Sequence, residues 1–327
     1  MRYVTLKDTD LSASQLCLGT AGFGGSCDVQ TSERRMDQFV CAGGNLLDTA
    51  HCYNDWLPGE KHRSEKVIGA WMKKRKNRSQ MIVGTKGGVI FDAERGVHWT
   101  QLSPDSLNAE MDDSLRNLQT DYIDIYWLHR DEPERPVEEI METLNRRVAA
   151  GDVRYIGCSN WRPERIRKAQ KYAEEHGLAP FIADELEWSA ARRLAPDTAV
   201  DPLLPWMTDE AMEYHKATKM TAFAFTSMAS GFFQKLENGG AEGLHEQMRR
   251  AFLRQETIRC LDRIRKLRAD GGYTTAQILM GYIRGQKHFT GIPIAFGRSE
   301  QQMQELLEAA DAVLTAEEIA FLLDGKE

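Results

Sequence analysis

Short apolar runs alternate with amphipathic stretches along almost the whole chain. The runs are continuous, which is typical of parallel strands buried on both faces, and the longer stretches carry apolar residues at helical spacing. Eight strands are predicted, at Leu16–Gly19, Asn45–Asp48, Met81–Thr85, Tyr122–Leu128, Arg154–Cys158, Phe181–Glu185, Thr221–Phe225 and Thr290–Ile294. Helices are predicted at Thr31–Ala42, Ser64–Lys74, Pro104–Leu118, Pro136–Ala150, Pro163–His176, Thr257–Arg268 and Glu300–Ala309. This series predicts an α/β fold, a closed (β/α)8 TIM barrel formed by one domain over residues 1–327.

Some segments fall outside the repeating pattern. Residues 2–15 predict a β-hairpin at the barrel floor, and Thr275–Gly285 predicts an extra helix. Ser103 directly precedes Pro104 and is predicted to cap the helix that starts there. Two further segments, Pro202–Trp206 and Asn238–His245, are candidate mobile loops, one of which would cover a cofactor.

Composition narrows the class of partner. The net charge is −7 and the basic residues are dispersed, which disfavours nucleic acid and anionic membranes as partners. The polar segment Met1–Asp10 lacks the apolar core of a signal peptide, and no run approaches the ~20 apolar residues of a spanning helix. The six cysteines show no C-x-x-C spacing, which indicates reduced thiols. We therefore expect a cytoplasmic protein that acts on a small molecule.

Four ionisable residues follow three successive predicted strands. Asp48 ends the second strand and Tyr53 lies in the loop after it. Lys86 follows the third strand and His129 ends the fourth. Because the C-terminal ends of barrel strands form the active-site face, we expect these side chains to converge on one rim.

Such a set can reduce a carbonyl group, which needs a hydride at carbon and a proton at oxygen. A lysine cation promotes ionisation of a neighbouring tyrosine, and a carboxylate keeps that lysine charged. A histidine can orient the carbonyl oxygen and stabilise the charge that develops there. We predict that Tyr53 is the general acid and that Lys86, held by Asp48, tunes it. His129 is predicted to orient the substrate.

Five segments resemble, in order, those of the aldo-keto reductase family. They are Gly19–Gly24 (GTAGFG), Asp48–Tyr53 (DTAHCY), Thr85–Lys86, Trp127–His129 and Gly157–Asn160 (GCSN). The resemblance covers nearly the whole chain and is closest to bacterial-type members with a short C-terminal region. It implies an NADP(H)-dependent carbonyl reductase of the aldehyde reductase or alcohol dehydrogenase type, with NAD(H) as the alternative cofactor.

The resemblance also implies a cofactor that lies extended across the barrel mouth. The residues it assigns to the cofactor are Gly19, Thr20, Ser159, Asn160, Glu185, Trp188, Thr226, Ser227, Met228, Gly231, Arg298 and Gln302. Ser159 and Asn160 would contact the carboxamide, and Trp188 takes the place of a tyrosine that stacks under the nicotinamide. Arg298 precedes a predicted helix, and this combination suits the dianionic 2′-phosphate of NADP(H).

Three features depart from the family pattern, among them Arg130 directly after His129, and two motifs have simpler interpretations. Glu185 stands where the family has a glutamine; it can accept from the nicotinamide amide but cannot donate to its oxygen. Leu306 stands where an asparagine usually contacts adenine. The alternative for Ser159–Asn160 is a helix cap, and the alternative for Asp48 with Lys86 is a structural ion pair.

The sequence also predicts a class of substrate, and it leaves two alternatives to carbonyl reduction open. Trp56 and Arg130 lie in predicted rim loops and are expected to line a pocket for a polar carbonyl, such as a sugar-like aldehyde. One alternative function is an aldolase that forms a Schiff base on Lys86. Another is a regulatory module that binds the cofactor with little turnover. The sequence has no H-x-H or H-E-x-x-H motif, so no metal is expected.

Overall fold

The structure, a computed structural model, describes residues 1–92, 94–192 and 204–325. Eight strands form a closed barrel in the order β10-β11-β12-β3-β4-β5-β8-β9, which confirms the predicted TIM barrel. The chain contacts divide it into two compact units, Tyr3–Asp184 and Glu185–Glu327 with Met1–Arg2. The first two residues of the predicted Pro202–Trp206 loop lie outside the described residues.

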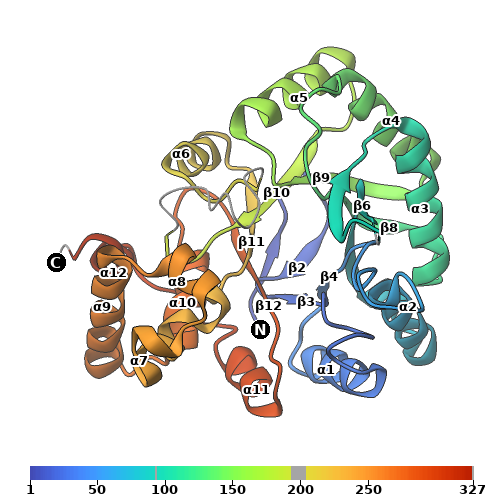
Figure 1. The fold of residues 1–327 in the computed structure, drawn as a ribbon. Coiled ribbons are helices and arrows are strands. Elements are labelled where there is room, and N and C mark those ends of the chain that lie inside the picture. The colour runs from blue at the N-terminus through green and yellow to red at the C-terminus, as the bar shows by residue number, and fades with distance from the viewer. Residues whose placement is uncertain (93, 193–203, 326–327) are drawn as a thin grey trace. The chain divides into compact units, whose positions relative to one another are not determined.

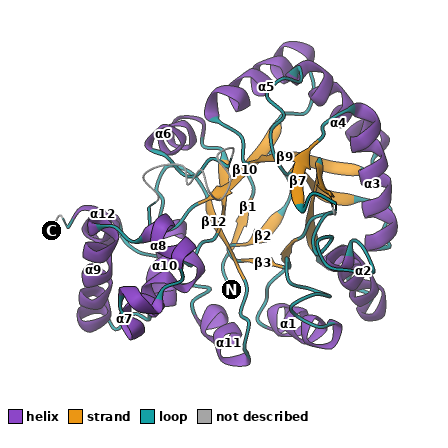
Figure 2. Cartoon of the chain, in the orientation of Figure 1, coloured by secondary structure: helices purple, strands orange, loops and turns teal. Residues whose placement is uncertain are grey.

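The Tyr3–Asp184 unit contains five of the barrel strands, each paired in parallel with the next (Figures 1 and 2). The strands are β3 (Cys17–Gly19), β4 (Leu46–Asp48), β5 (Ile82–Gly87), β8 (Ile123–Leu128) and β9 (Val153–Ser159). The helices are α1 (Val29–Cys41), α2 (Arg63–Arg75), α3 (Pro104–Leu118), α4 (Val137–Ala150) and α5 (Pro163–His176). Figure 1 shows these helices on the outer side of the strands.

Helix α3 illustrates how the local sequence sets an element. Its cap is Ser103, whose Oγ accepts a hydrogen bond from the Ser106 N–H at 3.3 Å, as predicted. Leu107, Met111 and Leu118 recur at helical spacing and are fully buried. The helix therefore packs one apolar face onto the sheet and leaves the opposite face to solvent.

The predicted N-terminal hairpin is confirmed as β1 (Tyr3–Thr5) paired antiparallel with β2 (Ser12–Ser14). The Asp10 carboxylate accepts hydrogen bonds from the Arg154 guanidinium at 2.8 Å and the Tyr155 hydroxyl at 2.9 Å. The Ser14 N–H donates to Asn45 Oδ1 at 2.8 Å. These partners lie at the N-terminal ends of β9 and β4, so within this unit the hairpin lies at the strand starts.

A second hairpin was not predicted from the sequence. It consists of β6 (Val89–Asp92) and β7 (Val97–Thr100) and directly follows β5. Its register places Ile90 opposite Trp99 and Phe91 opposite His98. An additional aromatic surface thus stands on the loop that follows the third barrel strand.

The Glu185–Glu327 unit holds the end of β10 (Phe181–Glu187), together with β11 (Thr221–Phe225) and β12 (Gly291–Ala295). Its helices among the described residues are α6 (Asp209–Thr218), α7 (Phe232–Gly239), α8 (Glu246–Phe252), α9 (Gln255–Gly271), α10 (Thr275–Arg284), α11 (Glu300–Glu308) and α12 (Ala316–Asp324). A core that includes Phe232, Ile264 and Tyr282 joins these helices except α11. The segment Asn238–His245 contains the end of α7 and a short 3-10 helix, Ala241–Gly243.

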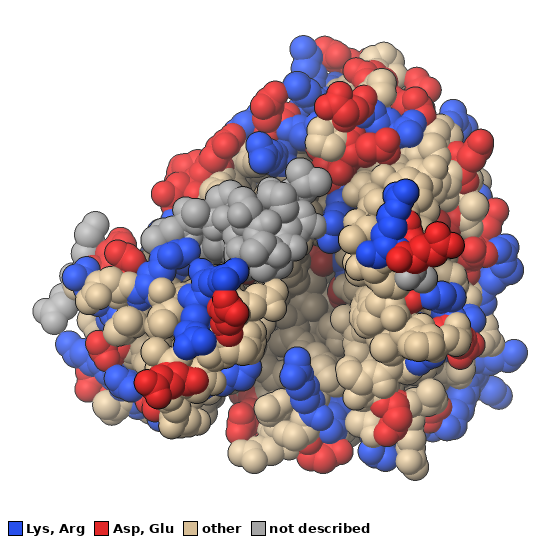
Figure 3. All heavy atoms as spheres, viewed as in Figure 1, with Lys and Arg blue, Asp and Glu red and all other residues tan. Residues whose placement is uncertain are grey.

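Surface properties agree with the composition. On the face in Figure 3, basic and acidic side chains are interspersed rather than gathered into one basic patch. None of the helices in the described residues is both long and apolar enough to span a membrane. All six cysteines are free thiols, and only Cys41 is exposed.

Candidate active site

The structure brings the Asp48, Tyr53 and Lys86 side chains into direct contact. The Lys86 ammonium lies 2.5 Å from Asp48 Oδ1 and 3.1 Å from the Tyr53 hydroxyl oxygen. It also donates to the Thr49 carbonyl oxygen at 3.1 Å. These acceptors match the three donors of an ammonium group, and Lys86 is only 1% exposed. Because Tyr53 accepts from Lys86, its own O–H proton is directed elsewhere.

His129 completes the set from the end of β8. Its imidazole ring lies edge-on to the Tyr53 ring, with 5.8 Å between the centroids. Burial, together with the positive charges of Lys86 and Arg130, holds the pKa of His129 well below its usual range. The imidazole is therefore neutral near pH 7, and its Nδ1 lies 3.6 Å from Cys52 Sγ.

Strand register explains this convergence. β4 and β5 pair Asp48 with Gly84, and β5 and β8 pair Lys86 with Trp127, two residues before His129. The His51 N–H then donates to the Lys86 carbonyl at 2.9 Å, which continues the pairing into the loop that carries Tyr53. The loop that carries Tyr53 is thus fixed to β5 by its backbone.

Buried polar side chains support this region and were missed by sequence reasoning. Glu65, fully buried on α2, accepts from Thr85 Oγ1 at 2.6 Å and from Asn117 Nδ2 at 3.0 Å. Burial raises the pKa of the Glu65 carboxyl. Glu110 on α3 accepts from the Gly88 N–H at 2.8 Å, and burial raises its pKa to about 7. Neither glutamate could be predicted from the sequence as a buried residue, because each lies on a helix among many surface acids.

The predicted cofactor residues of the Tyr3–Asp184 unit lie at strand ends. Gly19 ends β3, and the buried Thr20 hydroxyl donates to the Asp48 carbonyl at 2.7 Å. Ser159 ends β9, and Asn160 Nδ2 donates to Ser159 Oγ and to the His129 carbonyl, both at 3.0 Å. The simpler interpretation of Ser159–Asn160 as a helix cap is wrong, because Arg162 occupies the cap position of α5 without a side-chain hydrogen bond.

In the Glu185–Glu327 unit, the Glu185 and Trp188 side chains are almost fully buried, each with 3% exposure. The Trp188 indole N–H donates to the Tyr282 hydroxyl at 3.0 Å. After β11, the backbone has positive φ at Thr226 (54°) and Gly231 (77°). Between these two lie the partly buried Met228 and the buried Ser227, whose hydroxyl donates to the Ile294 carbonyl at 2.6 Å. Leu306, on α11, is buried, so it packs as a core residue.

The proposed phosphate residues flank the start of α11. Ser299 caps the helix by accepting from the Gln302 N–H at 3.1 Å. Gln302 Oε1 accepts from the Arg298 backbone N–H at 3.0 Å, while the Arg298 residue is exposed. The loop is therefore held by its own hydrogen bonds, and an exposed guanidinium group stands beside a helix N-terminus.

Of the two predicted substrate residues, Trp56 contacts the second hairpin and Arg130 adjoins His129. Trp56 is 42% exposed, and its ring lies edge-on to His98 of β7 with 5.9 Å between the centroids. His98 in turn packs against Phe91 of β6 at 5.0 Å. Arg130 is partly buried next to His129 and lowers the pKa of that histidine. The hairpin thus adds aromatic surface that the sequence interpretation lacked.

Comparison with known proteins identifies the family to which the chain belongs. A model of the Aldo/keto reductase family matches residues 15–323. The aryl-alcohol dehydrogenase (NADP+) of Phanerodontia chrysosporium is 31% identical over 92% of this chain and 77% of its own length. The norsolorinic acid reductase of Aspergillus flavus is 30% identical over 96% of this chain and 78% of its own length. The aldo-keto reductase ausK of Aspergillus calidoustus is 30% identical over 98% and 81%. The chain therefore belongs to the aldo/keto reductase family.

Proposed function

We propose that this oxidoreductase reduces an aldehyde or ketone to the alcohol with a hydride from NADPH, and that Tyr53 is the general acid. The observation that carries the proposal is the position of the Lys86 ammonium, which contacts both Asp48 Oδ1 and the Tyr53 hydroxyl. A structural ion pair alone would not need a tyrosine hydroxyl on the same ammonium group.

Each side chain has a definite task in this chemistry. Tyr53 gives its proton to the substrate oxygen, and the Lys86 ammonium stabilises the tyrosinate that forms. Asp48 compensates the charge of Lys86 in a buried position where an unpaired ammonium would be costly. NADPH, when bound, supplies the hydride to the carbonyl carbon.

Cys52 is proposed to set the tautomer of His129. Burial raises the pKa of the Cys52 thiol to about 12, so the thiol keeps its proton at neutral pH. Its S–H can donate to His129 Nδ1 at 3.6 Å, which leaves the imidazole proton on Nε2. A neutral His129 then donates that proton in a hydrogen bond to the substrate oxygen and orients the carbonyl group.

NADP(H) fits the residues present in each unit. In the Tyr3–Asp184 unit, Asn160 directly follows β9, and its side chain donates to the His129 carbonyl oxygen. In this position it would hold the carboxamide of the nicotinamide. In the Glu185–Glu327 unit, exposed Arg298 beside the capped start of α11 would pair with the 2′-phosphate. The other assigned residues, including Glu185, Trp188 and Gln302, are proposed contacts on the resemblance alone.

We propose an aromatic carbonyl as the preferred substrate, rather than the sugar-like aldehyde expected from the sequence. Exposed Trp56, edge-on to His98, offers a planar apolar surface in the loop that carries Tyr53. Two relatives are named as an aryl-alcohol dehydrogenase and a norsolorinic acid reductase, which supports this choice.

Substitution of Trp56 tests the substrate class. We expect Trp56→Ala to raise KM for benzaldehyde-type substrates about 3–10-fold, because a ring contact of this kind contributes about 0.5–1.5 kcal/mol. Trp56→Phe should retain most of the affinity, and KM for glyceraldehyde should change little. A larger loss with glyceraldehyde would favour the polar substrate.

The proposed activity itself is tested with purified protein, NADPH or NADH, and a panel of aromatic, aliphatic and sugar aldehydes. Loss of the reduced nicotinamide absorbance should occur with NADPH and should be abolished in Lys86→Met. Tight NADPH binding without turnover would favour the regulatory alternative. A borohydride-trapped adduct on Lys86 with a carbonyl compound alone would favour the aldolase.

A further inference from the structure

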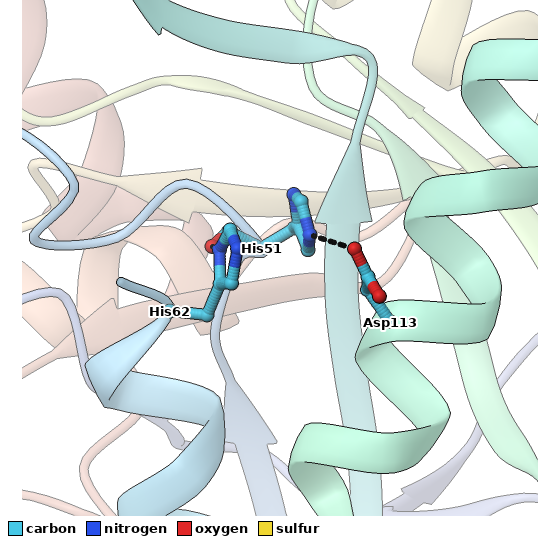
Figure 4. Close-up of side chains that lie close together, drawn as sticks. All are labelled: His51, His62 and Asp113. Carbon is cyan, nitrogen blue, oxygen red and sulfur yellow. Dashed lines mark hydrogen bonds and ion pairs between the residues drawn. The ribbon is translucent and has the colours of Figure 1, made fainter. Parts of the chain in front are cut away.

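Three side chains outside the catalytic set bring potential metal-ligand atoms together in the Tyr3–Asp184 unit. They are His51, His62 and Asp113, and one ligand atom of each lies within 4.8 Å of those of the other two (Figure 4). His51 follows β4, His62 occupies the cap position before α2, and Asp113 lies on α3. Nitrogen ligands from two elements and a carboxylate from a third thus converge on one point.

The hydrogen bonds of His62 fix which of its nitrogens is free of a proton. Its Nδ1 lies 2.7 Å from the His51 carbonyl oxygen and 3.3 Å from Asp55 Oδ2. A carbonyl oxygen only accepts, so Nδ1 carries the proton and Nε2 carries the lone pair. Imidazoles that bind metals are oriented in this way, with the second nitrogen bonded to a carbonyl or carboxylate oxygen.

His51 has a similar arrangement. Its Nδ1 lies 3.6 Å from Glu110 Oε2, and its Nε2 lies 3.7 Å from Asp113 Oδ2. The residue is only 9% exposed, and its Nε2 has no hydrogen-bond partner among the described residues. A buried ring nitrogen without a partner is costly unless something else binds it.

We propose that His51, His62 and Asp113 bind a divalent transition-metal ion, with Zn²⁺ the best match and a water molecule as fourth ligand. Two imidazoles favour Zn²⁺ over Mg²⁺ and Ca²⁺, which prefer oxygen ligands. Tetrahedral Zn–N bonds of about 2.0–2.1 Å place two ligand nitrogens about 3.3 Å apart. The ligand atoms of the stacked His51 and His62 rings and of Asp113 lie within 4.8 Å of one another, so small shifts would bring them to this separation as the ion binds.

The position of this site gives it a structural role near the catalytic set. His51 lies between Asp48 and Tyr53 in the sequence, and its N–H donates to the Lys86 carbonyl oxygen. A metal ion that joins His51 to α3 would therefore restrain the loop that carries the general acid. The site does not depend on the proposed carbonyl reduction, because its ligands do not include any of the four catalytic side chains.

The test is metal binding to the full chain after treatment with a chelator and removal of the chelator. Titration with Zn²⁺ by calorimetry, and with Co²⁺ by its visible spectrum, should show one tetrahedral ion per chain. Zn²⁺ should raise the thermal unfolding midpoint, whereas Mg²⁺ should not. The variants are His62→Gln and Asp113→Asn, and the matched controls are His176→Gln and Asp112→Asn, which alter exposed residues on α5 and α3.

Asp55→Asn removes a hydrogen-bond partner of the ligand His62, and we expect it to weaken Zn²⁺ binding by roughly 10–100-fold. His62→Gln removes the ligand itself, so we expect it to weaken binding by more than this. The controls should bind as the unaltered chain does. Asp113 is partly exposed, so Asp113→Asn keeps the test decisive if His62→Gln does not fold. Absence of stoichiometric Zn²⁺ binding, or binding unchanged in Asp113→Asn, would overturn the proposal.

Discussion

Buried ionisable residues in this protein differ in how their charge is compensated. Lys86 is charged and surrounded by three oxygen acceptors, including the Asp48 carboxylate. Glu65 is equally buried, but its carboxylate accepts hydrogen bonds from neutral side chains, among them Thr85 and Asn117. Neutral donors compensate a carboxylate charge less well than a cation does, so Glu65 favours its protonated form.

This difference predicts a pH dependence of stability. The folded-state pKa of Glu65 is raised above its ordinary value of 4.5, so its contribution to the free energy of unfolding is full below pH 4.5 and is lost as the pH rises above it. Glu65→Gln cannot titrate. We therefore expect the variant to gain stability relative to the unaltered chain as the pH rises from 4.5 to 8, measured by urea unfolding in buffer with chelator. The exposed Glu138→Gln serves as control, and a difference that does not vary with pH would contradict the assignment.

At the scale of elements, glycines on the two strands that flank β8 leave room for a large side chain of β8. Trp127 of β8 pairs with Lys86 of β5 and Gly157 of β9. A Cβ atom added at Gly157 would lie 2.4 Å from Trp127 Cε3, and one at Gly84 would lie 2.6 Å from Trp127 Nε1. The glycine of the GCSN segment thus makes room for the indole that precedes His129.

Gly157→Ala should therefore destabilise the protein by about 1–3 kcal/mol, the usual cost of overpacking a core. The matched control is Gly239→Ala in α7, where an added Cβ has no atom within 4 Å. Thermal and urea unfolding of both variants measure the difference. Equal stability of the two variants would show that Trp127 can move aside at little cost.

The sequence predicted most elements, but it missed those whose pattern is short or irregular. Helices such as α3 were predicted well because a cap, a proline and an apolar stripe agreed at Ser103–Leu118. The β6–β7 hairpin was missed because the apolar run Val89–Phe91 is very short and directly follows Gly87 and Gly88, which indicate a loop. Helices α7 and α8 have only 8 and 7 residues, too few for a clear period.

The candidate site also contains some residues that the sequence predicted and others that it missed. The convergence of Tyr53, Lys86 and His129 was predictable because each lies at or just after the end of a recognisable strand, so topology alone brings them together. The proposed metal ligands were not predictable, because His62, which precedes α2, and Asp113, on α3, are far apart in the sequence at no motif spacing. Only the packing of α2 and α3 beside the His51 loop reveals them.

At the scale of the whole molecule, the net charge of −7 repels NADPH and NADH, which are themselves anions. A preference for one of these cofactors must therefore come from local charge. In the Glu185–Glu327 unit, Arg298 offers a local cation next to the capped N-terminus of α11. An added 2′-phosphate would form charge-assisted hydrogen bonds with this guanidinium group.

We expect Arg298→Ala to weaken NADPH binding about 10–100-fold and NADH binding by less than about twofold, since a charge-assisted hydrogen bond contributes about 1.5–3 kcal/mol. Arg298→Lys should retain part of the preference because it keeps the charge without the planar fork. Dissociation constants from nicotinamide fluorescence measure both. Parallel losses for the two cofactors would place the 2′-phosphate elsewhere.

The central claim, that Tyr53 protonates the substrate oxygen, is tested most directly by the single-turnover rate of NADPH oxidation in Tyr53→Phe with a saturating aromatic aldehyde. The hydroxyl is the only group removed, and the ring that packs against His129 is retained. We predict a rate lower by about 10²–10⁴-fold, the usual contribution of a general acid, with the Kd for NADPH unchanged. A rate within about threefold of that of the unaltered chain would contradict the account, because the proton would then come from another group.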